Sequence, residues 1–402
     1  MELFGQIVVW IIMACALAGC VASVIRDDSP LGQEFLNGIR SIGSIFLPVG
    51  GIMAASPYLT AFVRNVAGPV FSFVGADASV AATTFIAVDM GGYQLADALA
   101  QTRESWIMAM VTGYMSGATI VFSIPVALKM LRKEDRRYLA MGTMAGFIAI
   151  PVGVFVSSAI IVLADPCIRE VISTSGPATY RLALDWGMVF VNLFPVAIIC
   201  GLIALGLFLI PEKMIKAFNV FGKLLESALS IVFVLCVIEY FTGIPSKLVG
   251  RWGFEPLIAD SNDIMRALEI SGYIGIMLCG AFPMVYLIRK YLARPLERIG
   301  RRAGLSADAT AGILAATANV LALFAMVRNL APQDKVKTVA YSVPCAFLIG
   351  DHLAFTANFQ PSLIIPVMAG KLSAGIVAIL IVQWGLPHWH IQNKSVTLRS
   401  TD

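Results

Sequence analysis

Long apolar runs recur along almost the whole of this 402-residue chain, and few charges interrupt them. Charged residues make up 13% of the sequence, whereas soluble domains carry roughly a quarter. In hydrocarbon every backbone polar group needs a protein partner, and a helix supplies it within the segment itself. The sequence therefore predicts an all-α polytopic helical bundle in a lipid bilayer. Such a chain is divided into membrane-spanning helices and not into soluble domains.

About eleven spans are predicted, because about 20 apolar residues in a helix cross about 30 Å of hydrocarbon. Nine apolar runs are expected to cross: residues 4–25, 38–63, 105–131, 138–164, 186–210, 224–241, 264–292, 341–358 and 362–384. Two further stretches, 66–100 and 305–327, are interrupted. Each is either a broken crossing helix or a re-entrant pair of short helices.

Basic residues in the loops orient these spans, since Lys and Arg gather on the cytoplasmic side of a membrane. The basic loops are residues 132–137, 213–223 and 289–302, and one orientation places all three inside. The loops 165–185 and 243–263 are then outside. The formal net charge of +4 lies in the loops and gives no indication of nucleic-acid binding.

No motif in the sequence indicates a cofactor or a metal. The seven cysteines are scattered without CxxC spacing and are interpreted as small core residues. There is no Walker loop, no GxGxxG, no HExxH and no His/Cys cluster, so neither nucleotide nor metal binding is predicted. No basic residue precedes the first apolar run, which favours a retained first helix over a cleaved signal peptide.

An internal repeat links the two ends of the chain. Residues 51–56 resemble residues 312–317, and Asp89 follows the first segment at nearly the distance at which Asp351 follows the second. The expected division is one transmembrane domain with a repeat at each end, a central group of spans and a polar tail. Its limits are 4–385 for the domain, about 4–131 and about 264–385 for the repeats, 138–242 for the central spans and 386–402 for the tail.

The interrupted stretches decide how the repeats are related. If both cross the membrane, the repeats have opposite orientations, whereas hairpins would make them parallel. Inverted repeats with interrupted helices place a transported substrate near the midplane of the membrane, between the repeats. We expect the inverted arrangement.

Two carboxylates, Asp89 and Asp351, lie in apolar surroundings. An ionisable group at membrane depth is costly and normally faces a cavity, a partner or a transported ion. Gly91 and Gly92 follow Asp89 and Gly350 precedes Asp351, so the backbone can turn sharply or approach a ligand at both places. Two carboxylates that converge on one cavity would suit a small organic cation. The alternative for each is to cap a helix.

Two basic side chains lie in the same apolar environment. His352 is a candidate to tune the site or to accept a proton, and its alternatives are a structural donor or a pair with Asp351. Lys371 lies in the middle of the last span. It either extends along the helix to the interface or forms an internal ion pair with Asp89 or Asp351.

Amide and aromatic side chains complete the candidates. Asn192 and Asn319 are buried amides near helix irregularities, and each either binds a ligand hydroxyl or bonds a carbonyl freed by the break. Tyr93 and Phe355 lie near the aspartates and could offer ring faces to an ammonium group. Glu269 lies one turn into a span, a position that favours a structural role.

Six ordered motifs in this chain resemble those of the bacterial ethanolamine permease family. They are residues 89–93, 119–128, 135–140, 210–215, 265–269 and 350–353. The resemblance extends over about residues 4–380. It implies a protein of the bacterial inner membrane, not an enzyme, that brings ethanolamine into the cytoplasm for breakdown.

The family pattern carries over to several of the candidates residue by residue. They are Asp89, Gly91, Gly92, Glu269, Asp351, His352 and Lys371. The resemblance makes Glu269 a candidate substrate ligand. The chain departs from the pattern at Asn319, which the family follows with a second asparagine, isoleucine and proline and this chain follows with Val320, Leu321 and Ala322.

The predicted site matches the chemistry of ethanolamine, which at neutral pH is mostly an ammonium ion with a hydroxyl two carbons away. We expect Asp89 or Asp351 to pair with the ammonium group and Asn319 to lie near the hydroxyl. One alternative is a transporter of another small amine or an amino acid, and a remote one is an intramembrane aspartyl enzyme. Because Gly- and Ala-rich helices allow close packing between copies of a chain, a homo-oligomer is also an alternative.

Overall fold

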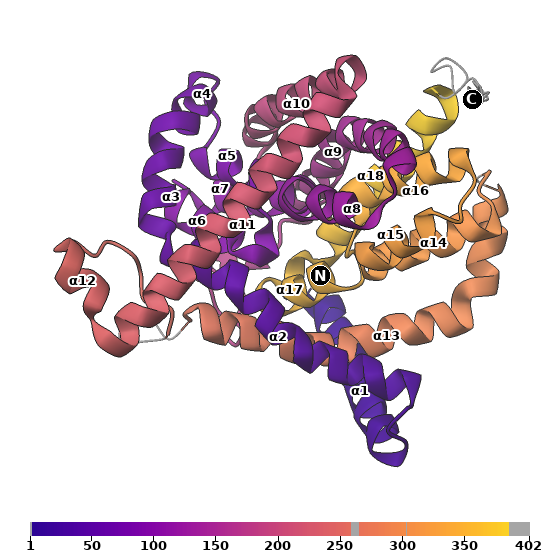
Figure 1. Cartoon of the computed structure of the whole chain (residues 1–402), viewed down its shortest axis with the longest axis horizontal. Coiled ribbons are helices and arrows are strands. Elements are labelled where there is room, and N and C mark those ends of the chain that lie inside the picture. Colours follow the sequence, from indigo (N-terminus) through magenta and orange to yellow (C-terminus); the bar gives the residue numbers. More distant parts are fainter. Residues whose placement is uncertain (1, 259–264, 303, 386–402) are drawn as a thin grey trace, which may run out of the picture.

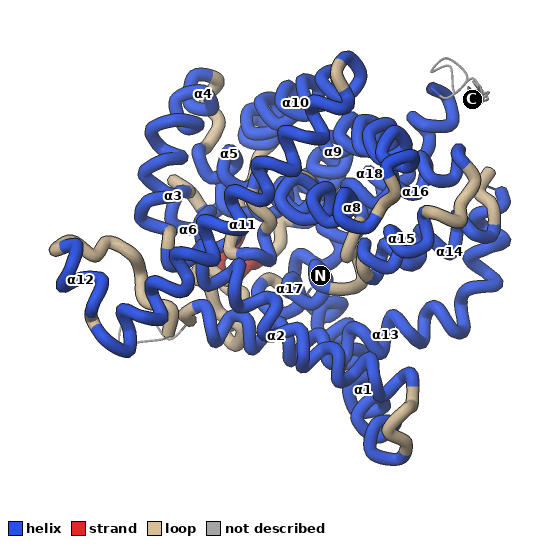
Figure 2. The backbone as a smooth tube through the Cα atoms, in the orientation of Figure 1, coloured by secondary structure: helices blue, strands red, loops and turns tan. Residues whose placement is uncertain are grey.

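The computed structural model describes residues 2–258, 265–302 and 304–385. Most of these residues are helical, and one short antiparallel pair of strands, β1 (Cys167–Ile168) with β2 (Tyr180–Arg181), lies in a loop (Figure 2). The predicted polar tail, 386–402, lies outside the described residues. The all-α fold predicted from the apolar runs is confirmed.

Eight helical segments in the described residues are long and apolar enough to cross a membrane (Figure 1). They are α1 (Glu2–Ile25), α2 (Pro30–Ala54), α7 with α8 (Arg103–Met115 and Ile124–Met130), α9 (Arg136–Ala164), α10 (Trp186–Leu209), α11 (Pro211–Thr242), α13 (Ala267–Arg302) and α18 (Ile364–Gly385). The chain is therefore a multi-pass membrane protein. The total of about eleven spans stays a prediction.

Shorter helices connect these segments. They are α3 (Ser56–Phe62), the π-helical turn η1 (Val63–Ala67) and α4 (Gly68–Phe73) after α2, the 3-10 turn η4 (Lys133–Asp135) before α9, α12 (Ile244–Val249) after α11, and the 3-10 turn η5 (Pro361–Leu363) before α18. Large apolar side chains such as Trp10, Phe208 and Phe241 are exposed on α1, α10 and α11. Such surfaces suit contact with lipid.

The first interrupted stretch folds back as a hairpin of α5 (Ala78–Phe85) and α6 (Gly92–Leu99). Asp77 closes its base, because one carboxylate oxygen accepts from the Ser79 N–H at 2.8 Å and the other from the Gln101 N–H at 3.1 Å. These bonds cap the start of α5 and hold it beside Gln101, two residues beyond the end of α6.

The second interrupted stretch is also a hairpin, formed by α14 (Ala307–Ala318) and α15 (Val320–Val327), which lie side by side in Figure 1. A Cβ on Gly312 would lie 3.1 Å from the Leu323 side chain, so α15 returns along α14. At the base, the Ser306 hydroxyl donates to the Asp334 carboxylate at 2.6 Å. Both interrupted stretches therefore re-enter the protein instead of continuing straight through it.

A broken helix follows each hairpin. After α5–α6, α7 ends at Met115 and the chain continues through the π-helical turn η3 (Thr119–Ser123) into α8. After α14–α15, α16 (Pro332–Cys345) and α17 (Asp351–Phe359) are separated by five residues. The Thr119 hydroxyl donates to the Val343 carbonyl at 2.7 Å, so the two breaks lie against each other.

Each hairpin tip lies against a helix break. The Ser116 hydroxyl donates to the Thr84 carbonyl at 2.6 Å, and the backbone N–H groups of Phe347 and Ile349 donate to the α14 carbonyls of Ala316 and Thr317 at 3.0 and 2.9 Å. Backbone groups freed by one interruption are thus satisfied by another, as the interior of a membrane protein requires.

A hairpin followed by a broken helix occurs twice in the described chain, and we propose that the two copies run in opposite directions, in an alignment that differs from the sequence match. Arg103 at the start of α7 donates to the Glu170 carbonyl in a loop predicted to be outside. Near the start of α16, Lys335 pairs at 2.6 Å with Asp135, which lies in a loop predicted to be inside. This order of elements sets Asp89 in the position of Asn319, whereas the sequence match paired Asp89 with Asp351. The repeats and their limits stay a prediction. We propose that the repeats align with Asp89 in the position of Asn319.

Helix α2 packs antiparallel on α13 at very short range. A Cβ on Gly38 would lie against the backbone N and Cα of Cys279, and a Cβ on Gly275 would lie against the Ile42 side chain. Gly43, on the same helix α2, has no atom within 4 Å of its Cβ position. Small residues allow such close helix contacts in membranes.

We predict that Gly38→Ala lowers the thermal stability of the purified protein, because the added methyl group forces the α2 and α13 backbones apart. Overpacking of this kind costs about 1–3 kcal/mol or more. Gly43→Ala is the matched control and is expected to leave the melting temperature unchanged or higher. Equal melting temperatures for the two variants in detergent would contradict the packing described for α2 and α13.

Candidate functional site

A cavity of about 470 Å³ lies between α2, α13, the two hairpin tips and the helix breaks. Its polar lining side chains are Ser41, Ser44, Asp89, Asn319 and Asp351. Its apolar lining residues include Ile45, Pro48, Met90, Phe122, Ile274, Phe282, Leu321 and Phe347. No Lys, Arg or His side chain of the described chain lines it. Two predicted carboxylates and one predicted amide therefore come together at one cavity.

Two glycines shape the tip that carries Asp89, which lies in the 3-10 turn η2 (Val88–Met90). Gly91 has φ 94°, a left-handed conformation that side-chain-bearing residues rarely adopt. A Cβ on Gly92 would lie 2.5 Å from the Ala87 carbonyl oxygen. The tight turn therefore requires glycine at both positions, and it directs Asp89 toward the cavity.

Asp89 and His352 form a polar cluster without complete hydrogen bonding. His352 Nε2 lies 3.7 Å from Asp89 Oδ2, which is too long for a hydrogen bond. Neither imidazole nitrogen nor Asp89 Oδ1 has a hydrogen-bond partner among the described residues, although all three atoms are buried. Buried polar atoms of this kind normally have a partner, so the cluster can accept a ligand donor. His352 lies behind the cavity lining.

Asp351 is the first residue of α17 and lines the cavity. A Cβ on Gly350 would collide with the Ala318 carbonyl oxygen, so the α14–α15 tip requires glycine there. Phe347, in the same break, has φ 60° although it bears a side chain. Within the described chain Asp351 makes no ion pair shorter than 4 Å, with His352 or with any other residue.

Lys371 is fully buried in α18, so it does not extend to the interface. Its Nζ donates at 2.6 Å to the Tyr114 carbonyl, which the end of α7 leaves without a helical partner. Neither Asp89 nor Asp351 lies within ion-pair distance of it among the described residues. Among the described residues Lys371 therefore makes no internal ion pair, and its ammonium group bonds the backbone at a helix break.

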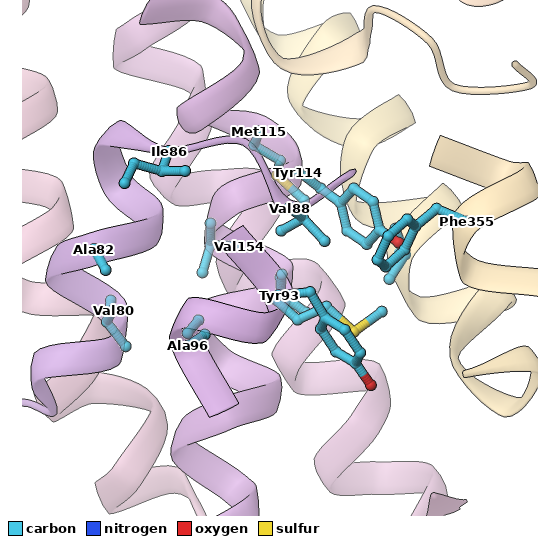
Figure 3. Packing of buried hydrophobic residues seen from close by; sticks show 14 of the residues in the cluster. Val80, Ala82, Ile86, Val88, Tyr93, Ala96, Tyr114, Met115, Val154 and Phe355 are labelled. Atoms are coloured by element: carbon cyan, nitrogen blue, oxygen red, sulfur yellow. The ribbon is translucent and has the colours of Figure 1, made fainter. Parts of the chain in front are cut away.

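Tyr93 and Phe355 are fully buried and do not line the cavity. Figure 3 shows both rings among the buried hydrophobic residues. The Tyr93 ring stacks on Trp106 at 4.6 Å, and its hydroxyl accepts from Gln360 Nε2 at 2.9 Å. Phe355 packs edge-on against Tyr93 at 5.5 Å. The rings that line the cavity are others, among them Phe122 and Phe347, which sequence reasoning did not select.

The two asparagines have different surroundings. Asn192 Oδ1 accepts from the Asp77 N–H at 2.9 Å and its Nδ2 donates to the Met188 carbonyl at 3.0 Å, so its amide is satisfied away from the cavity. Asn319 caps α15 by accepting from the Leu321 N–H at 2.9 Å. It also lines the cavity, and its Nδ2 makes no hydrogen bond within the described residues.

Glu269 does not reach this cavity. It lies in the first turn of α13 and lines a separate pocket of about 660 Å³ on the predicted outer side. Asp89, Asp351 and Asn319 are therefore the predicted residues that the structure brings together. Tyr93, Phe355 and His352 pack behind them, while Asn192 and Glu269 lie elsewhere.

A family model described as ethanolamine utilisation protein, EutH, matches residues 4–384. The chain belongs to the EutH family. The resemblance seen in the six sequence motifs is thereby confirmed. Membership also identifies the chain as a multi-pass bacterial membrane protein of a permease family and not as an enzyme.

Curated relatives of the EutH family match almost end to end. A protein of Listeria monocytogenes named probable ethanolamine permease EutH is 34% identical over 94% of this chain and 93% of its own length. The protein of the same name from Salmonella typhimurium is 35% identical over 89% of this chain and 86% of its own length. An uncharacterized protein of Bacillus subtilis, YxeR, is 31% identical over 94% of both chains. No solved structure matches the chain.

We predict that Asn192→Ala lowers thermal stability by about 1–3 kcal/mol, because it leaves the buried Asp77 N–H without an acceptor. The concentration dependence of substrate uptake is expected to stay as in the unchanged protein. Melting of purified protein and uptake by cells at matched expression measure the two effects. A raised apparent KM with unchanged stability would instead assign Asn192 to the substrate site.

Proposed function

We propose that this protein carries ethanolamine, as its ammonium ion, across the membrane into the bacterial cytoplasm for catabolism. The names of the EutH-family relatives support the substrate. The observation that carries the proposal is that two carboxylates, Asp89 and Asp351, line one cavity whose described lining has no basic side chain. A buried carboxylate without a partner is costly, and a bound cation removes that cost.

The lining can satisfy each part of the substrate. An ammonium group has three N–H donors, and the carboxylates of Asp89 and Asp351 supply acceptors. The hydroxyl can accept from Asn319 Nδ2, since that side chain's oxygen is already used to cap α15. Apolar residues such as Ile274 and Phe282 can contact the two methylene groups.

The same lining disfavours amino acids. An amino acid carries a carboxylate beside its ammonium group, and no described Lys or Arg side chain lines the cavity to pair with it. Two protein carboxylates would repel it, since like charges at short range in a low-dielectric site cost several kcal/mol. The geometry therefore favours a simple amine over the amino-acid alternative.

We predict that Asp89→Asn and Asp351→Asn each lower uptake of radiolabelled ethanolamine at sub-saturating concentration about tenfold or more. Losing one partner of a buried charge pair costs about 2–5 kcal/mol. The medium is kept acidic so that little neutral amine diffuses through the lipid. Asp308→Asn, an exposed residue in the first turn of α14, is the control. Uptake at the level of the unchanged protein in both aspartate variants, at normal expression, would refute the role of the aspartates.

We also predict the specificity of competition. Unlabelled small primary amines in excess should inhibit ethanolamine uptake, whereas glycine and serine should not, because their carboxylates meet two aspartates without a basic partner. The measurement is initial uptake with each competitor at the same concentration. Inhibition by glycine or serine as strong as by unlabelled ethanolamine would favour an amino-acid transporter.

A further inference from the structure

A second pocket, of about 660 Å³, opens on the predicted outer side between α6, the start of α13 and the loop at residues 171–175. Its described charged lining residues are Asp97, Glu255, Glu269 and Arg266. Asp97 pairs with Arg103 at 2.5 Å and Glu255 with Arg266 at 3.3 Å. Glu269 has no ion pair among the described residues. Two of the three carboxylates are thus offset by guanidinium groups, and the Glu269 carboxylate leaves the pocket with an excess negative charge that attracts cations.

Gln94 provides an independent sign of a ligand in this pocket. It lines the pocket, its side chain is only 9% exposed, and neither its Oε1 nor its Nε2 has a hydrogen-bond partner in the described chain. A buried amide without partners is unfavourable, and each such group in a native protein requires an explanation. A ligand hydroxyl, which both donates and accepts, would satisfy it.

The outer pocket lies next to the central cavity along the same helices. On α2, Pro48 lines the cavity and Met53 lines the outer pocket, and five residues of helix span about 7.5 Å. On α13 the adjacent residues Ile274 and Tyr273 line the cavity and the outer pocket, respectively. A molecule leaving the outer pocket along α2 would therefore meet the cavity next.

A thin partition separates the two spaces. The chain passes from Met90 at the cavity to Gln94 at the outer pocket, with Gly91 between them. The buried side chain of Ile52, 2% exposed, faces Gly91, where a Cβ would lie 2.8 Å from Ile52 Cβ. The absence of a side chain at Gly91 lets Ile52 close the space between pocket and cavity.

We propose that the outer pocket is a capture site for small hydroxylated ammonium ions, in which Glu269 pairs with the ammonium group and Gln94 bonds the hydroxyl before the ion reaches the central cavity. This inference rests on the proposed transport of ethanolamine. It assigns a substrate role to Glu269 at a site separate from the central cavity. It also adds Gln94, which no sequence motif singles out.

Uptake kinetics test the capture site. Glu269→Gln is expected to raise the apparent KM for radiolabelled ethanolamine about three- to tenfold at low ionic strength, with little change in the maximal rate. The difference in KM between the variant and the unchanged protein should shrink in about 0.3 M salt, because salt at that concentration strongly screens exposed charges. Glu297→Gln, near the inner end of the same helix α13, is the matched control and should keep the KM of the unchanged protein.

A binding measurement separates this inference from the proposed function. Purified Asp89→Asn/Asp351→Asn protein should still bind radiolabelled ethanolamine in equilibrium dialysis, and adding Glu269→Gln or Gln94→Ala should abolish the remaining binding. The capture site is overturned, and the central site left intact, by two results together. The Glu269→Gln variant keeps the KM of the unchanged protein, and the Asp89→Asn/Asp351→Asn protein binds no ethanolamine in equilibrium dialysis. Normal uptake by the double variant refutes the central site instead.

Discussion

Every helix interruption in this fold must find partners for its freed backbone groups within the protein, because hydrocarbon offers none. The two hairpin tips and two helix breaks meet this requirement together. Ser116 and Thr119 donate to carbonyls across the contacts, and Lys371 donates to a carbonyl that the end of α7 leaves open. None of these interruptions could persist alone at that depth. Their mutual hydrogen bonding brings Asp89 and Asp351, from segments far apart in sequence, to one cavity.

The long helices could be predicted from sequence, whereas the paths of the interrupted stretches could not. Residues 305–327 have the length and composition of a span, yet the chain reverses at Asn319 and α15 returns along α14. Hydropathy records how apolar a segment is and contains nothing about its direction. The sequence match does not reveal these paths either, since residues 51–56 lie at the end of α2 and residues 312–317 lie in a hairpin.

The central cavity was predictable from sequence only where a polar residue stands in an apolar segment. Asp89, Asp351 and Asn319 stand out in apolar surroundings, whereas the lining rings of Phe122 and Phe347 look like ordinary packing residues. Lys371 and Asn192 stand out as well, but their partners Tyr114 and Asp77 are 257 and 115 residues away. Contacts between residues so far apart in sequence cannot be read from the sequence alone. A polar side chain that bonds a free backbone group therefore looks the same in the sequence as one that binds a ligand.

The left-handed backbone of Phe347, described above at the α16–α17 break, has a consequence for how the cavity wall can move. Such a conformation costs a side-chain-bearing residue about 1–3 kcal/mol, and hydrogen bonds from Phe347 and Ile349 to the α14–α15 tip hold it in place. Separating tip and break gives up those bonds but releases the strain, so the two contributions partly cancel. The strain at Phe347 therefore lowers the net free-energy cost of separating the tip from the break.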